Sequence, residues 1–496
     1  MGTRERLVVE RRSEVRQILE RVLEAARREG AEYADARWVD RRSQVVRTKN
    51  GKVDRVREDH SRGVGVRVLV DGAWGFASGS RTDEESLMRI AAEAVRVARA
   101  SALRRSDPPV AMASVEPVEA EWRTPVSEDP FEVKLEDKIK TLLDADRIMR
   151  QVEGVKVARG SIAAFREDKI FASTEGSYIE QSKTEVGAGI EVLAVSGGEV
   201  QRRSWPASFG GNWAACGYEY VRQLDLPSRA EQTAREAVEL LDAEQCPGKV
   251  TDVILGGSQL ALQIHESCGH PIELDRVLGQ EASFAGTSFL TVDKLGEFQY
   301  GSEAVTITAD ATIPGGLGTF GYDDEGVPAQ RVTIVDQGRF VGYLTSRETA
   351  GRVGLQPTGA MRADGWNRIP LIRMTNINLE PGDWSLEEII RDTKEGILAD
   401  TVKSWSIDDR RLNFQFATEV AWEIKDGSLG RMLKNFTYTG ITPEFWRSCD
   451  AVGNKEEWQL WGLPNCGKGE PSQAAHVGHG AAPSRFRNVK VGVGRW

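Results

Sequence analysis

Two imidazoles and a carboxylate lie close together near the middle of the chain, in the segment His265-Glu266-Ser267-Cys268-Gly269-His270. In many zinc hydrolases a helix carries two histidines four residues apart on one face, and the glutamate after the first polarises a metal-bound water. Here the second histidine comes one residue later. Five helical steps turn a side chain roughly 140° around the axis, against roughly 40° for four. The two rings can therefore meet only if the helix breaks or bulges before His270.

Residues next to His270 allow such a break. Gly269 permits an unusual turn, and Pro271 disfavours the α conformation at His270, so we expect the helix to end there. Residues 258–264 are typical of the helix that carries His265. A histidine is more often a core or surface residue than a ligand. The chain has five histidines in all, however, and two of them in this pattern favour a metal site.

The site needs more than the two histidines. Catalytic zinc usually has three protein ligands. Cys466 lies in Leu463-Pro464-Asn465-Cys466-Gly467-Lys468-Gly469, where glycines predict a tight turn that lets the backbone approach a metal, and Lys468 would favour the thiolate. Alternatively Cys466 is a small buried residue. The third ligand would then be one of four others: His476, His479, Glu273 or Asp275.

Glu266 should differ in role from its neighbours. A residue beside the ligand His265 cannot easily bind the same ion, so we expect Glu266 to be the general base, which takes the proton of the water and passes it to the leaving amine. The reaction would then be hydrolysis of a peptide bond. Three residues are candidates for stabilising the oxyanion, and the sequence does not choose among them: Tyr322, His476 and His479.

The composition narrows the class of protein. A chain of 496 residues should form two or three domains, and 40% hydrophobic with 28% charged residues is ordinary for a globular protein. The net charge of −10 argues against general nucleic-acid binding. No apolar run is long enough to cross a bilayer, and residues 1–16 are charged throughout, unlike a signal peptide. The five cysteines form no disulfide framework. We expect a cytoplasmic protein without a membrane partner.

Periodic patterns predict an α+β fold. Helical spacing predicts amphipathic helices over residues 13–28 and 83–101, and alternation between them predicts two hairpins that turn at Asn50-Gly51 and Asp71-Gly72. We expect an N-terminal α/β part of helices covering antiparallel meanders, followed by a largely β C-terminal domain that carries the metal-site helix. Strands are expected there at 250–255, 304–308, 330–335, 339–344 and 414–424.

A shift to Pro, Ala, Ser and acidic residues marks the first boundary. The predicted division is an N-terminal α/β domain at 1–106, a linker or crossing segment at 107–130, a middle α/β domain at 131–245, and a mostly β domain with the metal site at 246–496. The middle domain is also expected to place a helix before its hairpins. That order echoes the first domain only weakly.

Motifs along most of the chain resemble the TldD/PmbA family of metallopeptidases, specifically its catalytic TldD-like branch. The segment from His265 to His270 resembles the family's H-E-x-x-x-H motif, which the PmbA-like branch lacks. Other segments similar to the family are Ala31-Glu32-Tyr33-Ala34-Asp35, Asn50-Gly51-Lys52-Val53, Gly63-Val64-Gly65-Val66-Arg67-Val68, Trp74-Gly75-Phe76-Ala77, Tyr322-Asp323-Asp324-Glu325-Gly326 and Asn465-Cys466-Gly467-Lys468-Gly469.

The resemblance implies a zinc-dependent peptidase acting on short or unfolded peptides. It also implies Cys466 as the third ligand, and a site enclosed in a dimer, either a homodimer or a heterodimer with a PmbA-like paralogue. A rival interpretation is a non-catalytic peptide-binding or scaffold protein with a structural metal site, but such a site does not need Glu266. A cysteine peptidase using Cys268 or Cys466 is disfavoured, because no His-Asn pair is positioned to support it.

Overall fold

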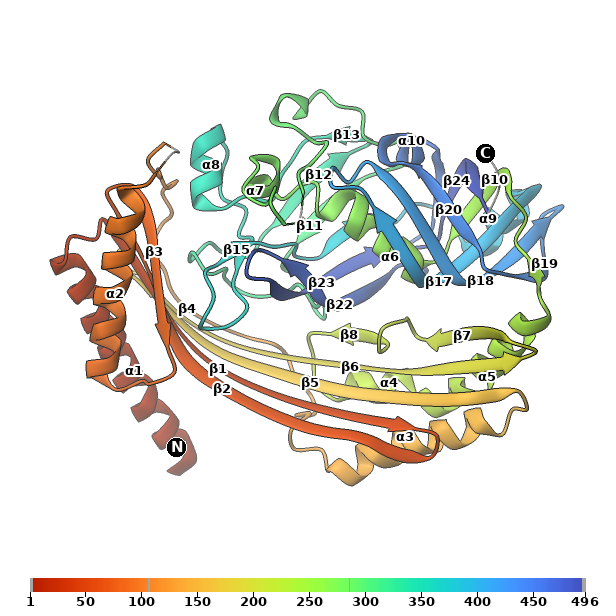
Figure 1. The fold of residues 1–496 in the computed structure, drawn as a ribbon, viewed down its shortest axis with the longest axis horizontal. Coiled ribbons are helices and arrows are strands. Elements are labelled where there is room, and N and C mark those ends of the chain that lie inside the picture. Colours follow the sequence, from red (N-terminus) through yellow and green to blue (C-terminus); the bar gives the residue numbers. More distant parts are fainter. Residues whose placement is uncertain (1–2, 106–107, 285, 493–496) are drawn as a thin grey trace.

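A computed structural model describes residues 3–105, 108–284 and 286–492. Helices and antiparallel strands in its first half and a strand-rich second half confirm the expected α+β class (Figure 1). The last four residues of the predicted C-terminal domain, 493–496, lie outside the described part of the chain. Among the described residues, no helix is long and apolar enough to cross a membrane.

Four long strands form a sheet that runs along most of the molecule (Figure 1): β1 (Tyr33–Lys49), β2 (Lys52–Val70), β5 (Val155–Ser173) and β6 (Tyr178–Ser196). Alternation before the Asn50-Gly51 turn predicts two strands, at 34–39 and 44–48, but in the structure they are one continuous strand, β1. The predicted Asn50-Gly51 turn joins β1 to β2, and both of its residues have positive φ, 50° and 78°. That geometry is the one Asn-Gly favours in two-residue hairpins.

Shorter strands complete this sheet, whose order is β3-β2-β1-β5-β6-β4. The segment at 107–130, expected to be a linker or crossing segment, contains β4, which pairs in parallel with β6. Because β1 pairs with β5, the N-terminal and middle parts of the chain share one sheet. Its remaining strands are β3 (Ala73–Gly79), β4 (Glu119–Arg123), β7 (Glu199–Trp205) and β8 (Asn212–Ala214), of which β7 and β8 pair with β6.

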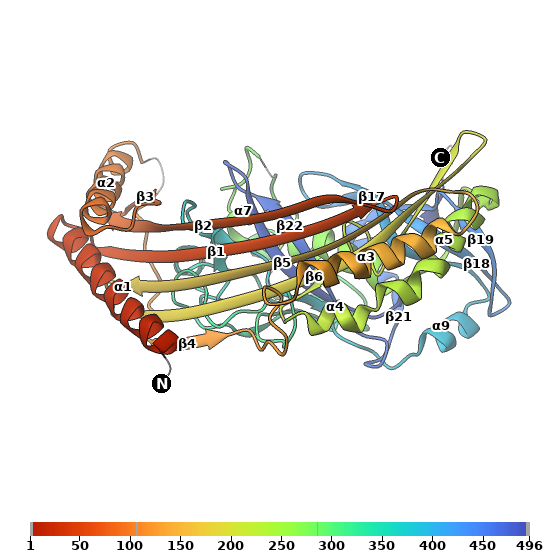
Figure 2. The same ribbon diagram turned by 90° about the horizontal axis from the view of Figure 1, so that it is seen from below.

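Helices cover one face of the sheet at its two ends (Figure 2). Ala34, Ala36 and Val46 of β1 alternate onto this face and are fully buried beneath them. The intervening side chains, among them Arg37 and Arg41, point to the opposite face, toward the C-terminal region. The covering helices are α1 (Thr3–Arg28) and α2 (Glu84–Ala102) at one end, and α3 (Leu135–Arg150), α4 (Glu219–Leu224) and α5 (Leu226–Asp242) at the other.

The C-terminal region is built on a closed ring of five strands, because β17 pairs with both β10 and β18. The strands of the ring are, in order, β17 (Glu395–Ile407), β10 (Lys249–Leu255), β24 (Ser484–Val491), β20 (Thr437–Ile441) and β18 (Asn413–Lys425). Attached to it are β9 (Glu244–Gln245), β19 (Ser428–Lys434) and β21 (Cys449–Val452). The helix α6 (Gly257–Ile264) follows β10, and its Leu260 and Ile264 are fully buried in the large core of this region.

Smaller sheets and short helices fill the rest of the C-terminal region. The strand expected over 339–344 is wrong beyond Phe340: the N–H of Val341 still donates to the carbonyl of Ile334 at 2.8 Å, but regular pairing with β12 ends at Phe340. The smaller strands are β11 (Ile307–Asp310), β12 (Arg331–Asp336), β13 (Arg339–Phe340), β16 (Ile377–Leu379), β14 (Met361–Arg362), β15 (Leu371–Ile372), β22 (Gln459–Lys468) and β23 (Gln473–Ala481). The helices are α7 (Leu274–Val277), a 3₁₀ turn at Val292–Lys294, α8 (Arg347–Val353), α9 (Leu386–Asp392) and α10 (Thr442–Arg447).

Candidate metal centre

The helix α6 continues into a π-helical turn, His265–Gly269. The N–H of His270 donates to the carbonyl of His265 at 3.1 Å, across five residues instead of four. The extra residue is absorbed as a bulge, so both imidazoles come to the same side of the helix. Their ring centroids lie 4.8 Å apart. The predicted bulge is confirmed.

The causes of the bulge differ from those expected. His270 has helical backbone angles (φ −69°, ψ −42°) although Pro271 disfavours them, but the helix does end at this point, with Gly269 as the last residue of the π-turn. The preference set by a following proline is steric and modest, and the π-turn hydrogen bond outweighs it. Gly269 allows close packing, because a Cβ at this position would lie 2.3 Å from the sulfur of Met374.

The structure brings Cys466 to the two histidines from far along the chain. The ligand atoms of His265, His270 and Cys466 all lie within 4.8 Å of one another, and all three residues are buried. Sγ of Cys466 is 3.8 Å from Nε2 of His270. Cys466 belongs to strand β22 and not to a tight turn, which corrects that expectation. The turn follows at Gly469, and the β22–β23 hairpin carries Cys466 to the π-turn.

The hydrogen bonds of His265 fix which nitrogen is free. Nδ1 of His479 lies 3.2 Å from the carbonyl of Ile377, which can only accept, so Nδ1 carries the proton. Burial lowers the pKa of His479 well below its usual value, so the ring is neutral and its Nε2 accepts from Nδ1–H of His265 at 2.8 Å. Nε2 of His265 is therefore unprotonated and available to a metal.

A carboxylate fixes which nitrogen of His270 is free. Its Nδ1–H donates to Oε2 of Glu273 at 3.0 Å, which leaves Nε2 free. Lys468 and Arg276 lie 3.5 Å from the two oxygens of Glu273, and Lys468 also donates to Asp275 at 2.7 Å. Glu273 and Asp275 are thus engaged beside the centre and are not within its group of three donors. Carboxylates that orient a ligating histidine in this way raise the affinity of metal sites.

The donors are set to be neutral imidazoles and an acidic thiol. Burial lowers the pKa of His265 to about 4 and that of His270 well below its usual value. Burial alone would raise the pKa of Cys466, but His270 and Arg373 outweigh it and leave that pKa below the usual value of a thiol. The expected helper, Lys468, instead pairs with carboxylates. Two imidazoles and a thiolate are donors that suit zinc, and three donors are typical of a catalytic site.

Glu266 lines the same cavity and has a partner that the sequence did not reveal. Nη1 of Arg411 donates to Oε2 of Glu266 at 2.5 Å. Arg411 lies in the loop between β17 and β18 and has a positive φ of 62°. This loop is held by bonds from Thr287 and Phe289 to the carbonyls that precede Arg411. No local pattern identifies Arg411, because the contact depends on how the ring of strands closes.

The cavity that contains these residues has a volume of about 320 Å³. Its walls come from α6 and the π-turn, from the β22–β23 hairpin, and from the segment that connects β7 to β8. Phe209 and Trp405 also line it, are 45% and 44% exposed, and pack edge to face at 5.6 Å. The centre is thus buried at the end of a cavity that exposed aromatic rings border.

The other residues singled out in the sequence lie elsewhere or have other contacts. His479 lines the metal cavity but bonds to His265, whereas Tyr322 and His476 do not line it. His476 bonds to Glu185 at 2.5 Å in a separate cavity. Cys268 is fully buried in the apolar core, and burial raises its pKa to about 12. Such a thiol is a poor nucleophile, which further disfavours a cysteine peptidase based on Cys268.

Three family descriptions match successive parts of the chain: PmbA/TldA metallopeptidase domain 1 at residues 34–98, the central domain at 128–243 and the C-terminal domain at 247–493. These matches cover most of the chain. The protein belongs to the PmbA/TldA family of metallopeptidases, as the resemblance of its motifs implied.

Named relatives point to the same activity. A metalloprotease of Methanocaldococcus jannaschii is 32% identical over 91% of this chain and 95% of its own length. A metalloprotease of Methanothermobacter thermautotrophicus is 32% identical over 93% and 95%. A Haemophilus influenzae protein named metalloprotease TldD homolog is 28% identical over 87% and 86%. With such relatives over most of its length, the chain is a TldD-like metallopeptidase.

Solved structures share the fold. A crystal structure of a Thermotoga maritima protein superposes with a TM-score of 0.76 at 20% identity, covering 96% of this chain and 99% of that one. The structure of TldE from Thermococcus kodakarensis superposes with a TM-score of 0.71 at 16% identity, covering 96% and 100%. The arrangement of the long sheet and the C-terminal region is therefore that of known folds.

Proposed function

We propose that the chain is a zinc-dependent peptidase that hydrolyses short or unfolded peptides, with His265, His270 and Cys466 as zinc ligands and Glu266 as the general base. The observation that carries this proposal is the convergence of three buried donors in which both imidazoles already present an unprotonated nitrogen. A preformed set of donors of this kind supports a resident metal.

The residues of the site have different chemical roles. When bound, zinc polarises a carbonyl and lowers the pKa of a water molecule to about 7. Glu266 takes the proton of that water and delivers it to the leaving amine. Its Oε2 accepts from Arg411, so Oε1 is the oxygen left to receive the proton. Arg411 is in this way a positioning residue for the base.

The shape of the cavity supports a restricted class of substrate. A volume of about 320 Å³ is at the lower end for ligand pockets and suits one or two residues of an extended peptide. Phe209 and Trp405 offer apolar contact to its side chains. A folded protein could not place a peptide bond beside a buried centre. Short or unfolded peptides should be cut and stably folded proteins spared.

Membership of the family supports two further parts of the proposal. The enzyme would act in the cytoplasm, and it would act as a dimer, formed either with a second copy or with a PmbA-like paralogue. Light scattering on the purified active protein tests the dimer, and an active monomer would contradict it. A scaffold with a structural metal site gains no support, because Glu266 shares the cavity with an open set of three donors.

The decisive experiment is Glu266→Gln. Loss of a general base slows hydrolysis by about 10² to 10⁴-fold, while the three donors remain. Bound zinc measured by atomic absorption should equal that of the wild type, and cleavage of an unstructured fluorogenic peptide should fall by that factor. The control is Glu387→Gln, which changes an exposed carboxylate on α9. A Glu266→Gln enzyme that cleaves at the wild-type rate would remove Glu266 from the mechanism.

A further inference from the structure

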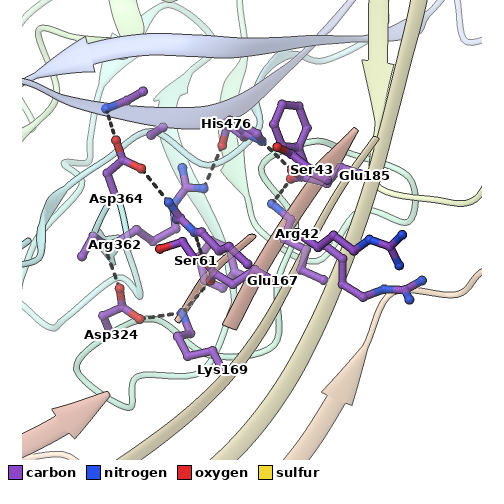
Figure 3. Close-up of a pocket in the computed structure, with 18 of the residues that line it drawn as sticks. Arg42, Ser43, Ser61, Glu167, Lys169, Glu185, Asp324, Arg362, Asp364 and His476 are labelled. Carbon is purple, nitrogen blue, oxygen red and sulfur yellow. Dashed lines mark hydrogen bonds and ion pairs between the residues drawn. The ribbon is translucent and has the colours of Figure 1, made fainter. Parts of the chain in front are cut away.

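A second cavity, of about 330 Å³, lies between the long sheet and the C-terminal region (Figure 3). It shares the β22–β23 hairpin with the metal cavity. Cys466 lines the metal cavity, whereas its cross-strand partner Ala475 and the next residue, His476, line the second one. We call the second one the charged cavity, since most of the side chains in Figure 3 are ionisable.

Almost every charge that points into the charged cavity is already paired. Arg42 and Arg166 stack on Phe131, at 4.6 and 5.2 Å, on the other face of the sheet. The inward cations lie 2.5 to 2.7 Å from carboxylates in the following pairs: Arg41 with Glu167 and Asp364, Lys169 with Asp324, and Lys183 with Glu185. These pairs need no ligand.

Arg362 is the exception. Among the described residues it has no carboxylate within ion-pair distance. Its Nη1 donates to the carbonyl of His476 at 2.8 Å and its Nη2 to the carbonyl of Met374. A guanidinium has five N–H groups, so each terminal nitrogen keeps one for another acceptor. Burial, together with nearby Arg373, lowers the pKa of Arg362 to about 10, as expected for a desolvated cation without a counter-ion.

We infer that the charged cavity is a second binding site, separate from the metal centre, for a zwitterionic amino acid or short peptide whose carboxylate pairs with Arg362. A guanidinium in a partly desolvated site binds a carboxylate well, because its planar donors match the two oxygens. The cavity volume accommodates a ligand of one or two residues.

The lining favours a zwitterion over a polyanion. Five carboxylates line the cavity and outnumber its four inward cations, of which three are already paired, so a phosphate with two negative charges would meet an excess of negative charge. The carboxylates are those of Asp59, Glu167, Glu185, Asp324 and Asp364. A ligand that carries an ammonium group as well as a carboxylate matches both signs. Short peptides are products of the proposed reaction, so the supply of the ligand rests on the proposed function. The binding site itself does not.

The test is calorimetric titration of the metal-free, full-length protein with L-alanyl-L-alanine. Without metal there is no hydrolysis, so failure of this proposal and failure of the proposed function are told apart. The wild type should bind one equivalent saturably. Arg362→Gln should weaken binding at least tenfold, since it removes a charge-assisted hydrogen bond. Arg331→Gln, which changes an exposed arginine on β12 outside the cavity, should not.

Ligand analogues and a second variant complete the experiment. Alanyl-alaninamide lacks the carboxylate and should bind at least tenfold more weakly, and inorganic phosphate should not compete. Ala474→Phe fills the cavity from an exposed position of β23 and should abolish binding even if Arg362→Gln fails to fold. The inference is overturned if no saturable binding occurs, if phosphate binds as well as the dipeptide, or if binding survives in Ala474→Phe.

Discussion

The two cavities on the β22–β23 hairpin follow opposite electrostatic rules. The metal cavity collects groups that burial keeps uncharged, and its only described ion pair is between Glu266 and Arg411. The charged cavity collects full charges and, apart from Arg362, stabilises its inward cations in ion pairs. Burial of a charge is tolerated only when it is paired, whereas a metal ligand must present a free lone pair. One hairpin therefore separates a site built for a cation from a site built on ion pairs.

The difference predicts that substitutions in the two cavities have different effects. Removing a donor from the metal cavity should abolish activity and leave the fold intact, because the donors contribute little to packing. Removing a charge from the charged cavity should cost stability and depend on pH, because its partner is left buried and alone. Four variants test this contrast.

Cys466→Ala should have the largest effect. It leaves zinc two protein ligands in place of three, so bound zinc should fall strongly and peptide cleavage should become undetectable. The free energy of unfolding of the metal-free protein should change by only about 1 kcal/mol, the cost of a small buried cavity. Metal analysis and urea unfolding check the two parts. If Cys466→Ala keeps full zinc and activity, the third ligand is another residue.

Asp324→Asn should be next, and its effect should depend on pH. Burial opposes ionisation of Asp324, but Lys169 and Arg37 outweigh it and lower its pKa to about 2. An unfolded aspartate has a pKa of about 3.9, so the ionised form contributes about 2 to 3 kcal/mol above pH 5. Because the folded pKa is the lower one, this contribution is lost as pH falls from about 4 to about 2.

Urea unfolding at pH 7, 4 and 3 measures this dependence. The wild type should exceed Asp324→Asn by about 2 to 3 kcal/mol at pH 7, and the difference should shrink at pH 3. Asp168→Asn is the control, since Asp168 is an exposed aspartate of the same long sheet. A difference that stays constant from pH 7 to pH 3 would show that the pairing of Asp324 does not stabilise the fold.

The metal cavity could be predicted from the sequence further than the charged one. His265 and His270 lie five residues apart in the chain, and helical geometry alone required the bulge between them. Cys466 could be proposed because it sits in a distinctive segment. His479 and Glu273 fix the tautomers, a role that the sequence does not reveal because their bonds depend on tertiary packing. From the sequence both were alternative ligands, and His479 was also a candidate for stabilising the oxyanion.

Less of the charged cavity could be predicted from the sequence. Arg37 and Arg41 alternate with apolar residues in β1, which predicts a strand with one apolar face, and such a polar face is usually exposed. In the structure the C-terminal region covers it. Asp324 and Asp364, the partners of Arg37 and Arg41 in that region, lie 287 and 323 residues away along the chain, so no local pattern could pair them. All three acidic residues at 323–325 are buried; Asp324 and Glu325 pair with arginines of the long sheet, whereas Asp323 accepts from backbone N–H groups, among them that of Met361.

Glu273→Gln should have a smaller effect than Cys466→Ala or Asp324→Asn, and it tests how His270 is oriented in the metal cavity. The amide keeps the shape of the side chain but removes the charge that favours Nδ1–H on His270. Zinc affinity should fall by about 10- to 100-fold, the usual effect of losing such a partner. Competition with a chromophoric chelator measures it, and Glu281→Gln, a nearby buried glutamate without contact to the histidines, is the control. Unchanged affinity would mean that Glu273 does not orient the ligand.

Cys268→Ala should have the smallest effect, although Cys268 lies inside the histidine motif. Its side chain is fully buried in the apolar core and outside the group of three donors. Loss of the sulfur should cost about 1 kcal/mol of unfolding free energy, with zinc content and cleavage retained. Cys449→Ala, at another buried thiol, should behave alike. If Cys268→Ala instead loses zinc as Cys466→Ala does, Cys268 is a second sulfur ligand of the centre.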